Sequence, residues 1–237
     1  TLSADCGSTL RVAGTLANLS GGTLDGGAYY AAGAMYLPGA VTSNNASITL
    51  DGADSRILVN GGSANALENL TRNTGALNIL NGKAYSGPGM VNDGTVRVSN
   101  ATATFSSAFA NNGTFISDPA TVSFHDKVSV SETGVMQGAA GDAYEFYQDF
   151  LINSTASLWA TKDVDLAFLG GKSHTFSFLS SDKGGMWDAL TLGESDSLDV
   201  SGIGGALTIY GLISGLDISD TVITNITGAY GTTIYYL

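Results

Sequence analysis

The chain has 237 residues, of which 32 are glycine and only 13% are charged, and its 21 acidic residues against nine basic ones give a net charge of −12. This charge excludes nucleic acid as a partner, because nucleic-acid binding depends on Lys and Arg that neutralise phosphates. The few charges argue against a helical protein and favour a β-structure with frequent turns, while the 43% of hydrophobic residues exclude a disordered chain.

Cys6 is the only cysteine, so the chain can form no internal disulfide. The sequence begins without Met or an apolar leader, and we therefore expect a processed or truncated chain. The longest uncharged stretch between acidic residues in the C-terminal part covers 200–216, contains five glycines and alternates like a strand. It is shorter than the roughly 18 apolar residues of a spanning helix, so we expect no membrane span.

One phrase returns at a fixed spacing: NTGALNI at 73–79, NDGTVRV at 92–98 and NNGTFIS at 111–117, each 19 residues after the last. Each copy is an Asn-x-Gly turn that leads into a short strand. Looser relatives of the phrase lie at 18–24, 44–50 and 152–160, and a further turn glycine at Gly134. A repeat of about 20 residues matches one coil of a β-solenoid, in which each repeat buries its apolar residues against its neighbours.

Strand phrases such as ASITL (46–50), SRILV (55–59) and TVRVS (95–99) alternate apolar with polar residues, as half-buried strands do. We therefore predict an all-β, right-handed β-solenoid (β-helix) of roughly ten coils, a rod on the order of 50 Å long. In this fold Leu77, Val96 and Phe115 should be stacked neighbours in the interior.

Two segments break the repeat. The spacing of Ala66, Leu67 and Leu70 predicts a short helix over 63–72, and the aromatic-rich segment 141–152 fits either a strand or one helical turn. From about residue 162 the strands lengthen and acidic residues gather. We therefore divide the chain into a β-helical repeat region, 1–161, and a C-terminal β region, 162–237, that continues or caps the solenoid in a less regular form.

Three C-terminal strand phrases resemble the segment that precedes the sorting tail of PEP-CTERM exoproteins: Trp159 with Thr161, His174 with Phe176, and 225–228 followed by 234–236. The Gly-rich first part resembles the repeats of autotransporter passengers and exported adhesins. The resemblance implies a protein secreted to the surface or surroundings of a Gram-negative bacterium, associated with exopolysaccharide and biofilm, and without assigned enzymatic activity. The Pro-Glu-Pro tail itself is not in this sequence.

Catalytic motifs are missing: there is no Gly-x-Ser-x-Gly, and the signatures of β-helical polysaccharide hydrolases are not found. We therefore predict that the protein is not an enzyme and needs no cofactor, with calcium as the one alternative. Calcium favours clustered carboxylates, and five fall within 18 residues, without EF-hand spacing, so the cluster is either a solvated loop or a calcium site: Asp182, Asp188, Glu194, Asp196 and Asp199.

The uncharged C-terminal strand lacks the charges that protect exposed sheet edges. The predicted assembly interface comprises Tyr230, Thr232, Thr233, Ile234, Tyr235, Tyr236 and Leu237. The first hypothesis is thus an extracellular structural protein that forms a homo-oligomer or homopolymer, with filaments joined through the solenoid ends or this strand. A monomeric adhesin or exopolysaccharide-binding module is the second hypothesis, and a polysaccharide lyase or hydrolase the third.

Overall fold

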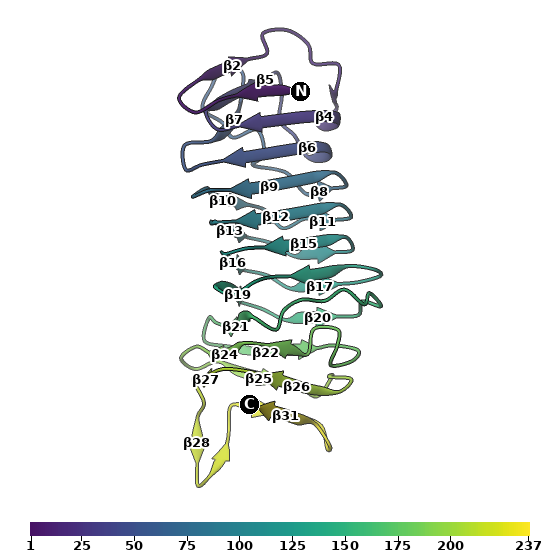
Figure 1. The fold of residues 1–237 in the computed structure, drawn as a ribbon, viewed down its shortest axis with the longest axis vertical. Coiled ribbons are helices and arrows are strands. Elements are labelled where there is room, and N and C mark those ends of the chain that lie inside the picture. The colour runs from purple at the N-terminus through teal and green to yellow at the C-terminus, as the bar shows by residue number, and fades with distance from the viewer.

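Short strands with alternating inward and outward residues make up the regular structure of this chain. The computed structural model describes residues 1–237 and contains no helix; the strands are wound into a parallel β-solenoid of about nine turns (Figure 1). The near strands of Figure 1 run to the left while the chain descends from the N-terminus at the top, so the winding is right-handed. The predicted fold class is confirmed.

Three faces surround a single core, and successive coils pair strand on strand in each face except between β7 and β10 and between β18 and β23. The face nearest the viewer in Figure 1 contains β1 (Leu2–Ala4), β3 (Leu19–Ser20), β4 (Thr23–Ala31), β6 (Ser43–Asp51), β9 (Ala76–Leu80), β12 (Thr95–Ser99), β15 (Thr114–Ser117), β18 (Val135–Gln137), β23 (Met186–Trp187), β26 (Ala206–Ile209) and β31 (Thr233–Tyr236). Here and below we call it the first face.

The second face, behind the first, contains β8 (Arg72–Asn73), β11 (Val91–Asn92), β14 (Phe109–Asn111), β17 (Val128–Val130), β20 (Phe150–Ile152), β22 (Ser173–Ser177), β25 (Ser197–Asp199) and β30 (Ile226–Thr227). The third face contains β2 (Thr9–Arg11), β5 (Ala34–Leu37), β7 (Arg56–Val59), β10 (Ala84–Gly87), β13 (Ala101–Phe105), β16 (Ala120–Phe124), β19 (Asp142–Phe146), β21 (Val164–Phe168), β24 (Ala189–Leu192) and β27 (Ile213–Ser214). An antiparallel hairpin of β28 (Ile218–Ser219) and β29 (Val222–Ile223) projects from the C-terminal end.

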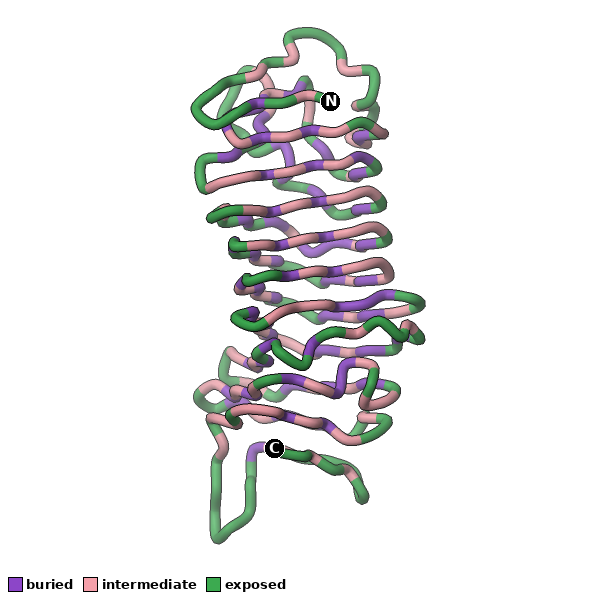
Figure 2. The backbone as a smooth tube through the Cα atoms, in the orientation of Figure 1, coloured by how far each residue is buried: buried purple, intermediate pink, exposed green.

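The 19-residue repeat corresponds to one coil. Val96 pairs with Leu77 on one side and with Phe115 on the other, and all three side chains are fully buried. The predicted interior ladder is therefore confirmed. Figure 2 shows the same alternation of buried and half-buried residues along β9, β12 and β15 of the first face.

The repeated glycines are needed because successive coils come close together at this corner. A Cβ atom on Gly94 would collide with the Gly75 carbonyl oxygen, and one on Gly113 would collide with that of Gly94. The three glycines do not have positive φ. Close backbone approach, rather than a left-handed conformation, thus excludes any other residue here.

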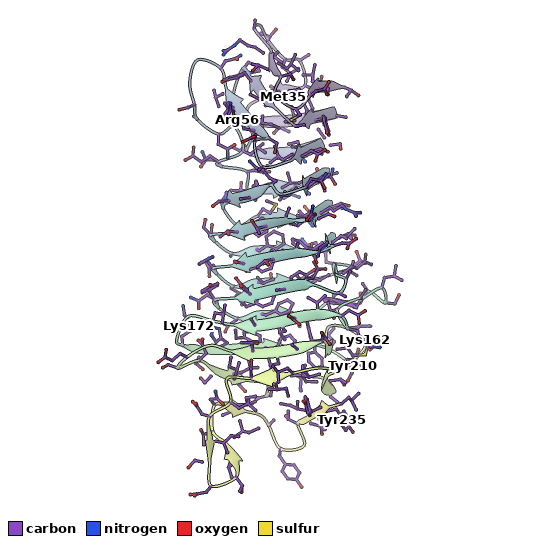
Figure 3. The ribbon with its side chains drawn as sticks, turned by 60° about the vertical axis from the view of Figure 1, so that its left-hand side comes forward. Met35, Arg56, Lys162, Lys172, Tyr210 and Tyr235 are labelled. Carbon is purple, nitrogen blue, oxygen red and sulfur yellow. The ribbon has the colours of Figure 1, made fainter.

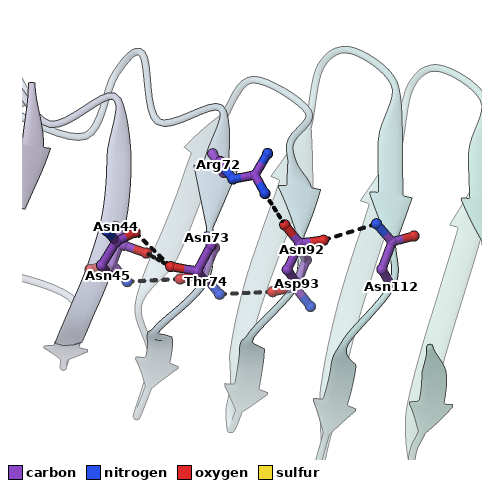
Figure 4. Close-up of polar contacts among 8 residues, drawn as sticks. All are labelled: Asn44, Asn45, Arg72, Asn73, Thr74, Asn92, Asp93 and Asn112. Carbon is purple, nitrogen blue, oxygen red and sulfur yellow. Dashed lines mark hydrogen bonds and ion pairs between the residues drawn. The ribbon is translucent and has the colours of Figure 1, made fainter. Parts of the chain in front are cut away.

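The repeated asparagines form a buried ladder on the same corner (Figure 4). The Nδ2 group of Asn44 donates to Oδ1 of Asn73 at 2.7 Å, Asn73 donates to Asn92 at 2.8 Å, and Asn92 donates to Asn111 at 2.8 Å. Each of these three amides also donates to a main-chain carbonyl, for example Asn92 to Thr114 at 3.2 Å. The amides are fully buried, so the ladder supplies the partners that buried polar groups require.

Aromatic side chains stack along the third face inside the core. The rings of Phe105 and Phe124 lie 5.5 Å apart at 15°, and those of Phe124 and Phe146 lie 5.3 Å apart at 11°. Phe168 continues the column. Each phenylalanine occupies the same position in its coil, so the rings of successive coils stack on one another inside the core.

The predicted helix over 63–72 is wrong. The segment forms turns and an isolated antiparallel bridge between Leu58 and Asn65. The apolar residues of this segment are nevertheless buried: Ala66, Leu67 and Leu70. Their spacing therefore predicted correctly which residues face the core, but not the conformation of the chain. Segment 141–152 forms strands β19 and β20, and the ladders of the second and third faces run on across residue 161 without interruption.

Candidate functional site at the C-terminal end of the rod

The last strand of each face is paired along one edge only. β27 pairs with β24, β30 with β25 and β31 with β26, and none of the three has a partner on its outer edge. Unpaired edges expose rows of N–H and C=O groups that can pair with another chain. The parallel ladders of the solenoid therefore end in open form.

Most of the exposed large hydrophobic side chains of the protein gather at this end. Seven of the ten lie between residues 218 and 237: Ile218, Val222, Ile223, Tyr230, Tyr235, Tyr236 and Leu237. No Lys or Arg follows Lys183, so cationic side chains do not protect the edges. Exposed apolar surface of this kind marks interaction sites in soluble proteins.

An apolar hollow of about 270 Å³ lies within this end. Ile223 from the hairpin, Ile226 from β30 and Ile234 from β31 line it together with Val200. The hollow thus sits where the hairpin and the two last strands meet. A partner that pairs with the strand edges would also cover it.

The hydrogen-bond register identifies which groups of β31 face outward. The N–H of Leu237 donates to the Ile209 carbonyl oxygen at 3.0 Å, and Tyr236 is the register partner of Ile209. In a parallel ladder alternate residues bond to opposite sides. The N–H and C=O groups of Ile234 and Tyr236 therefore point away from β26, toward the open edge.

The structure places the predicted assembly residues as follows. Thr233, Ile234, Tyr235 and Tyr236 form β31, and Leu237 follows it; Tyr230 and Thr232 lie in the turn before it. Tyr230 is fully exposed, and Figure 3 shows Tyr235 at this end of the rod, whereas Ile234 faces the core. Sequence reasoning missed the hairpin residues Ile218, Val222 and Ile223, although their apolar character was visible.

The N-terminal end differs. Its apolar residues Leu10, Val12, Leu16 and Leu19 are half-buried and pack against the core. No exposed large hydrophobic side chain precedes Leu158. One edge strand, β1, nevertheless pairs only with β4 and leaves its outer edge open on the first face.

The five acidic residues predicted as an alternative calcium site do not form a cluster. Asp182 accepts a hydrogen bond from Ser180 at 2.6 Å, and Asp199 accepts one from Ser201. Asp188 precedes β24, Glu194 lies in the turn after it, and Asp196 is buried. No group of three or more His, Cys, Asp or Glu side chains in the structure is arranged to hold a metal ion.

Asp196 instead forms a buried pair with His174. Its Oδ1 lies 2.8 Å from Nε2 of His174 and also accepts the N–H of Lys172 at 2.7 Å, while Nδ1 of His174 lies 3.2 Å from the Gln148 carbonyl oxygen. Burial acts to raise the pKa of Asp196, but the hydrogen bonds from Lys172 and His174 outweigh it, and the pKa is lowered. The pair joins β22 to the segment that precedes β25 in the next coil, which is a structural role for His174.

The structure contains no helix that is long and apolar enough to cross a membrane. No protein-family model, no curated protein and no solved structure matches this chain. The assignment of a role therefore rests on the geometry described above.

Proposed function

We propose that the protein is an extracellular structural protein of the bacterial surface or biofilm matrix that assembles end to end. The observation that carries this proposal is the open C-terminal end, where an uncharged edge strand, exposed aromatic residues and an apolar hollow lie together. The extracellular setting is supported by the resemblance of Trp159, His174 and the strand phrase at 225–236 to those of PEP-CTERM exoproteins.

The two ends of the rod are suited to join head to tail. β1 and β31 lie on the same face and run in the same direction (Figure 1). When β31 of one copy pairs with β1 of the next, the parallel ladder of the first face continues from copy to copy. Such a contact joins two different surfaces, and repeated head-to-tail contacts give an open filament when the rotation does not close a ring.

The energy of this contact comes mainly from apolar burial. The exposed parts of Tyr235, Tyr236 and Leu237 leave water when a second copy covers them, and fully burying one large side chain contributes about 1.5–3 kcal/mol. Hydrogen bonds along the open edge fix the orientation of the next copy more than they add to affinity, because each of them replaces a hydrogen bond to water.

Two substitutions test the contact without disturbing the coil. Tyr236→Pro removes an N–H that points to the open edge and takes no part in pairing with β26. Leu237→Ser removes apolar surface from a residue that is 69% exposed, and Leu158→Ser is its matched control, since Leu158 is 71% exposed but lies between β20 and β21, away from the last coil.

We expect filaments of the parent protein in negative-stain electron microscopy and rapidly sedimenting species in analytical ultracentrifugation. Tyr236→Pro and Leu237→Ser should yield shorter filaments or monomers at the same concentration, whereas Leu158→Ser should behave as the parent. A parent protein that stays monomeric, or filaments that both C-terminal variants leave unchanged, would refute the proposal. A monomer would favour the alternative of an adhesin or polysaccharide-binding module.

A further inference from the structure

Two basic side chains on the third face, Arg56 and Lys83, have no acidic partner. The chain has only nine basic residues against 21 acidic ones, so most cations could find a carboxylate. Ion pairs nevertheless form only between Arg72 and Asp93 and between His174 and Asp196. Arg56 and Lys83 instead line one hollow together, and Figure 3 places Arg56 on the upper coils of the rod.

The hollow exists because the sheet of the third face is interrupted there. Its first part ends at β7 and its second part begins at β10, and the two strands do not pair. Residues 60–71 are inserted between the coils, and the N–H of Ala66 donates to the Ile57 carbonyl oxygen in place of a parallel strand. This leaves the edge of β10 that faces β7 without a strand partner.

The unpaired edge directs main-chain donors into the break. Thr102 donates to the Lys83 carbonyl oxygen and Ser106 donates to that of Gly87, so these positions of β10 bond toward β13. By the alternation of a parallel ladder, the N–H groups of Ala84 and Ser86 face the opposite side, where β7 would lie in a regular coil. Free N–H groups beside two cations favour an anion.

The hollow has a volume of about 160 Å³ and combines an apolar floor with a cationic rim. Leu50, Ile57 and Leu58 supply the floor, and Asn65 supplies an amide. A second hollow, of about 360 Å³, shares Arg56 and crosses the first coils past Ser8, Thr9 and Ala34. The first volume suits a single charged group, and the second suits the polar chain that carries it.

The surroundings of Lys83 disfavour the charged form of its side chain. Its Nζ donates to the Ser55 carbonyl oxygen at 2.6 Å, which uses one of the three ammonium hydrogens. Burial, and after it the positive charge of Arg56, lowers the pKa of Lys83. Asp54 lines the second hollow but forms no ion pair with either cation. The charge of Asp54 offsets part of this effect on the pKa of Lys83, and an oxyanion between the two cations would offset more of it.

We propose that Arg56 and Lys83, with the open edge of β10, bind the oxyanion group of an acidic glycan. The planar guanidinium of Arg56 can take two oxygens of a carboxylate or sulfate, and Lys83 acts as a point charge beside it. The net charge of −12 repels densely charged polyanions such as nucleic acids. Hydroxyl-rich chains with separated acidic groups fit the polar second hollow. This inference does not depend on end-to-end assembly.

The test measures binding of defined oligosaccharides to the whole 237-residue protein by isothermal titration calorimetry. The probes are a galacturonate tetramer for the carboxylate, a carrageenan tetrasaccharide for the sulfate, and maltotetraose as the neutral control. We expect one or both acidic probes to bind, with an affinity that falls as sodium chloride is added, and maltotetraose to show no binding.

Arg56→Gln and Lys83→Met should each weaken the binding of the acidic probe about tenfold or more, since each removes charge-assisted hydrogen bonds. Lys127→Met is the matched control, because Lys127 is an exposed lysine outside both hollows, and it should bind as the parent does. Circular dichroism and thermal melting establish that each variant is folded. Failure of both acidic probes to bind, or equal weakening by Lys127→Met and Lys83→Met, would overturn the proposal.

Discussion

The asparagine ladder makes a specific prediction for the substitution Asn92→Ala. The Asn92 amide accepts from Asn73 at 2.8 Å and donates to Asn111 at 2.8 Å and to the Thr114 carbonyl oxygen at 3.2 Å. Asn73 keeps a second acceptor, the Thr95 carbonyl oxygen at 3.0 Å, so its Nδ2 remains satisfied. Oδ1 of Asn111 loses its donor in a fully buried position, whereas the Thr114 carbonyl oxygen is only partly buried and lies within the β12–β15 ladder.

A buried polar group left without a partner costs about 1–3 kcal/mol, so Asn92→Ala should lower the free energy of unfolding by about that amount. The matched control is Asn112→Ala. Asn112 follows the ladder by one residue and donates to Asp93 at 2.9 Å in an outer, exposed row (Figure 4). Its loss should cost no more than about 0.5 kcal/mol, because water replaces the lost partner.

Urea unfolding followed by far-UV circular dichroism measures both free energies, and equal slopes with urea show that the variants unfold from the same state. If Asn92→Ala and Asn112→Ala differ by less than about 0.5 kcal/mol, the ladder does not stabilise the corner and the reasoning fails.

Three further predictions follow from the coil. Gly94→Ala should strongly destabilise or misfold the protein, because its Cβ would meet the Gly75 carbonyl oxygen, whereas Gly14→Ala meets nothing and should leave the melting temperature unchanged; equal melting temperatures would contradict the close approach. Phe124→Ala should cost about 3–5 kcal/mol in urea unfolding, since it removes a fully buried ring from the aromatic column; a loss below 1 kcal/mol would show that the column tolerates a hole. Asp196→Asn should reduce the loss of stability at acid pH. The pKa of Asp196 is lowered by folding, so its carboxylate contributes stability above the unfolded pKa of about 3.9, and this contribution is lost as the pH falls through the folded pKa. Urea midpoints at pH 6 and pH 3 measure this, and an equal drop in both proteins would exclude Asp196 as a source.

The acid response of Asp196 should not be confused with that of Asp142, which has the opposite sign. Burial raises the pKa of Asp142, although the N–H groups of Ala120 and Ala139 donate to its carboxylate. Folding therefore disfavours its charged form, and this cost is relieved as pH falls through the raised pKa. Net acid stability is the balance of the two carboxylates, and only substitution at one of them separates the effects.

At the C-terminal end the sequence and the structure can be compared residue by residue. The uncharged strand phrase singled out residues that are exposed in the structure, and their role in assembly stays a prediction: Tyr230, Tyr235, Tyr236 and Leu237. The five acidic residues from Asp182 to Asp199 are close in sequence but do not cluster in space. Strand alternation turns Asp196 inward to His174 and leaves Asp199 outside. Proximity along a strand does not place side chains on one face.

Helical spacing over 63–72 was a misleading signal for a related reason. Ala66 and Leu70 are buried, but the inserted residues 60–71 bury them from irregular turns rather than from a helix. The conformation was decided by the Leu58–Asn65 bridge and by hydrogen bonds to β7, which are contacts that no local pattern encodes.

By itself the sequence determined the coil. A constant spacing of 19 residues makes Leu77, Val96 and Phe115 superimpose, because coils of equal length repeat their geometry at every turn. The tertiary structure decided the rest: that the repeated asparagines are buried donors, that repeated glycines are sites of close approach, and that Arg56 and Lys83, 27 residues apart, line one hollow. Those features depend on which coils lie next to each other. The strand pairing that decides this is complete only in the folded rod.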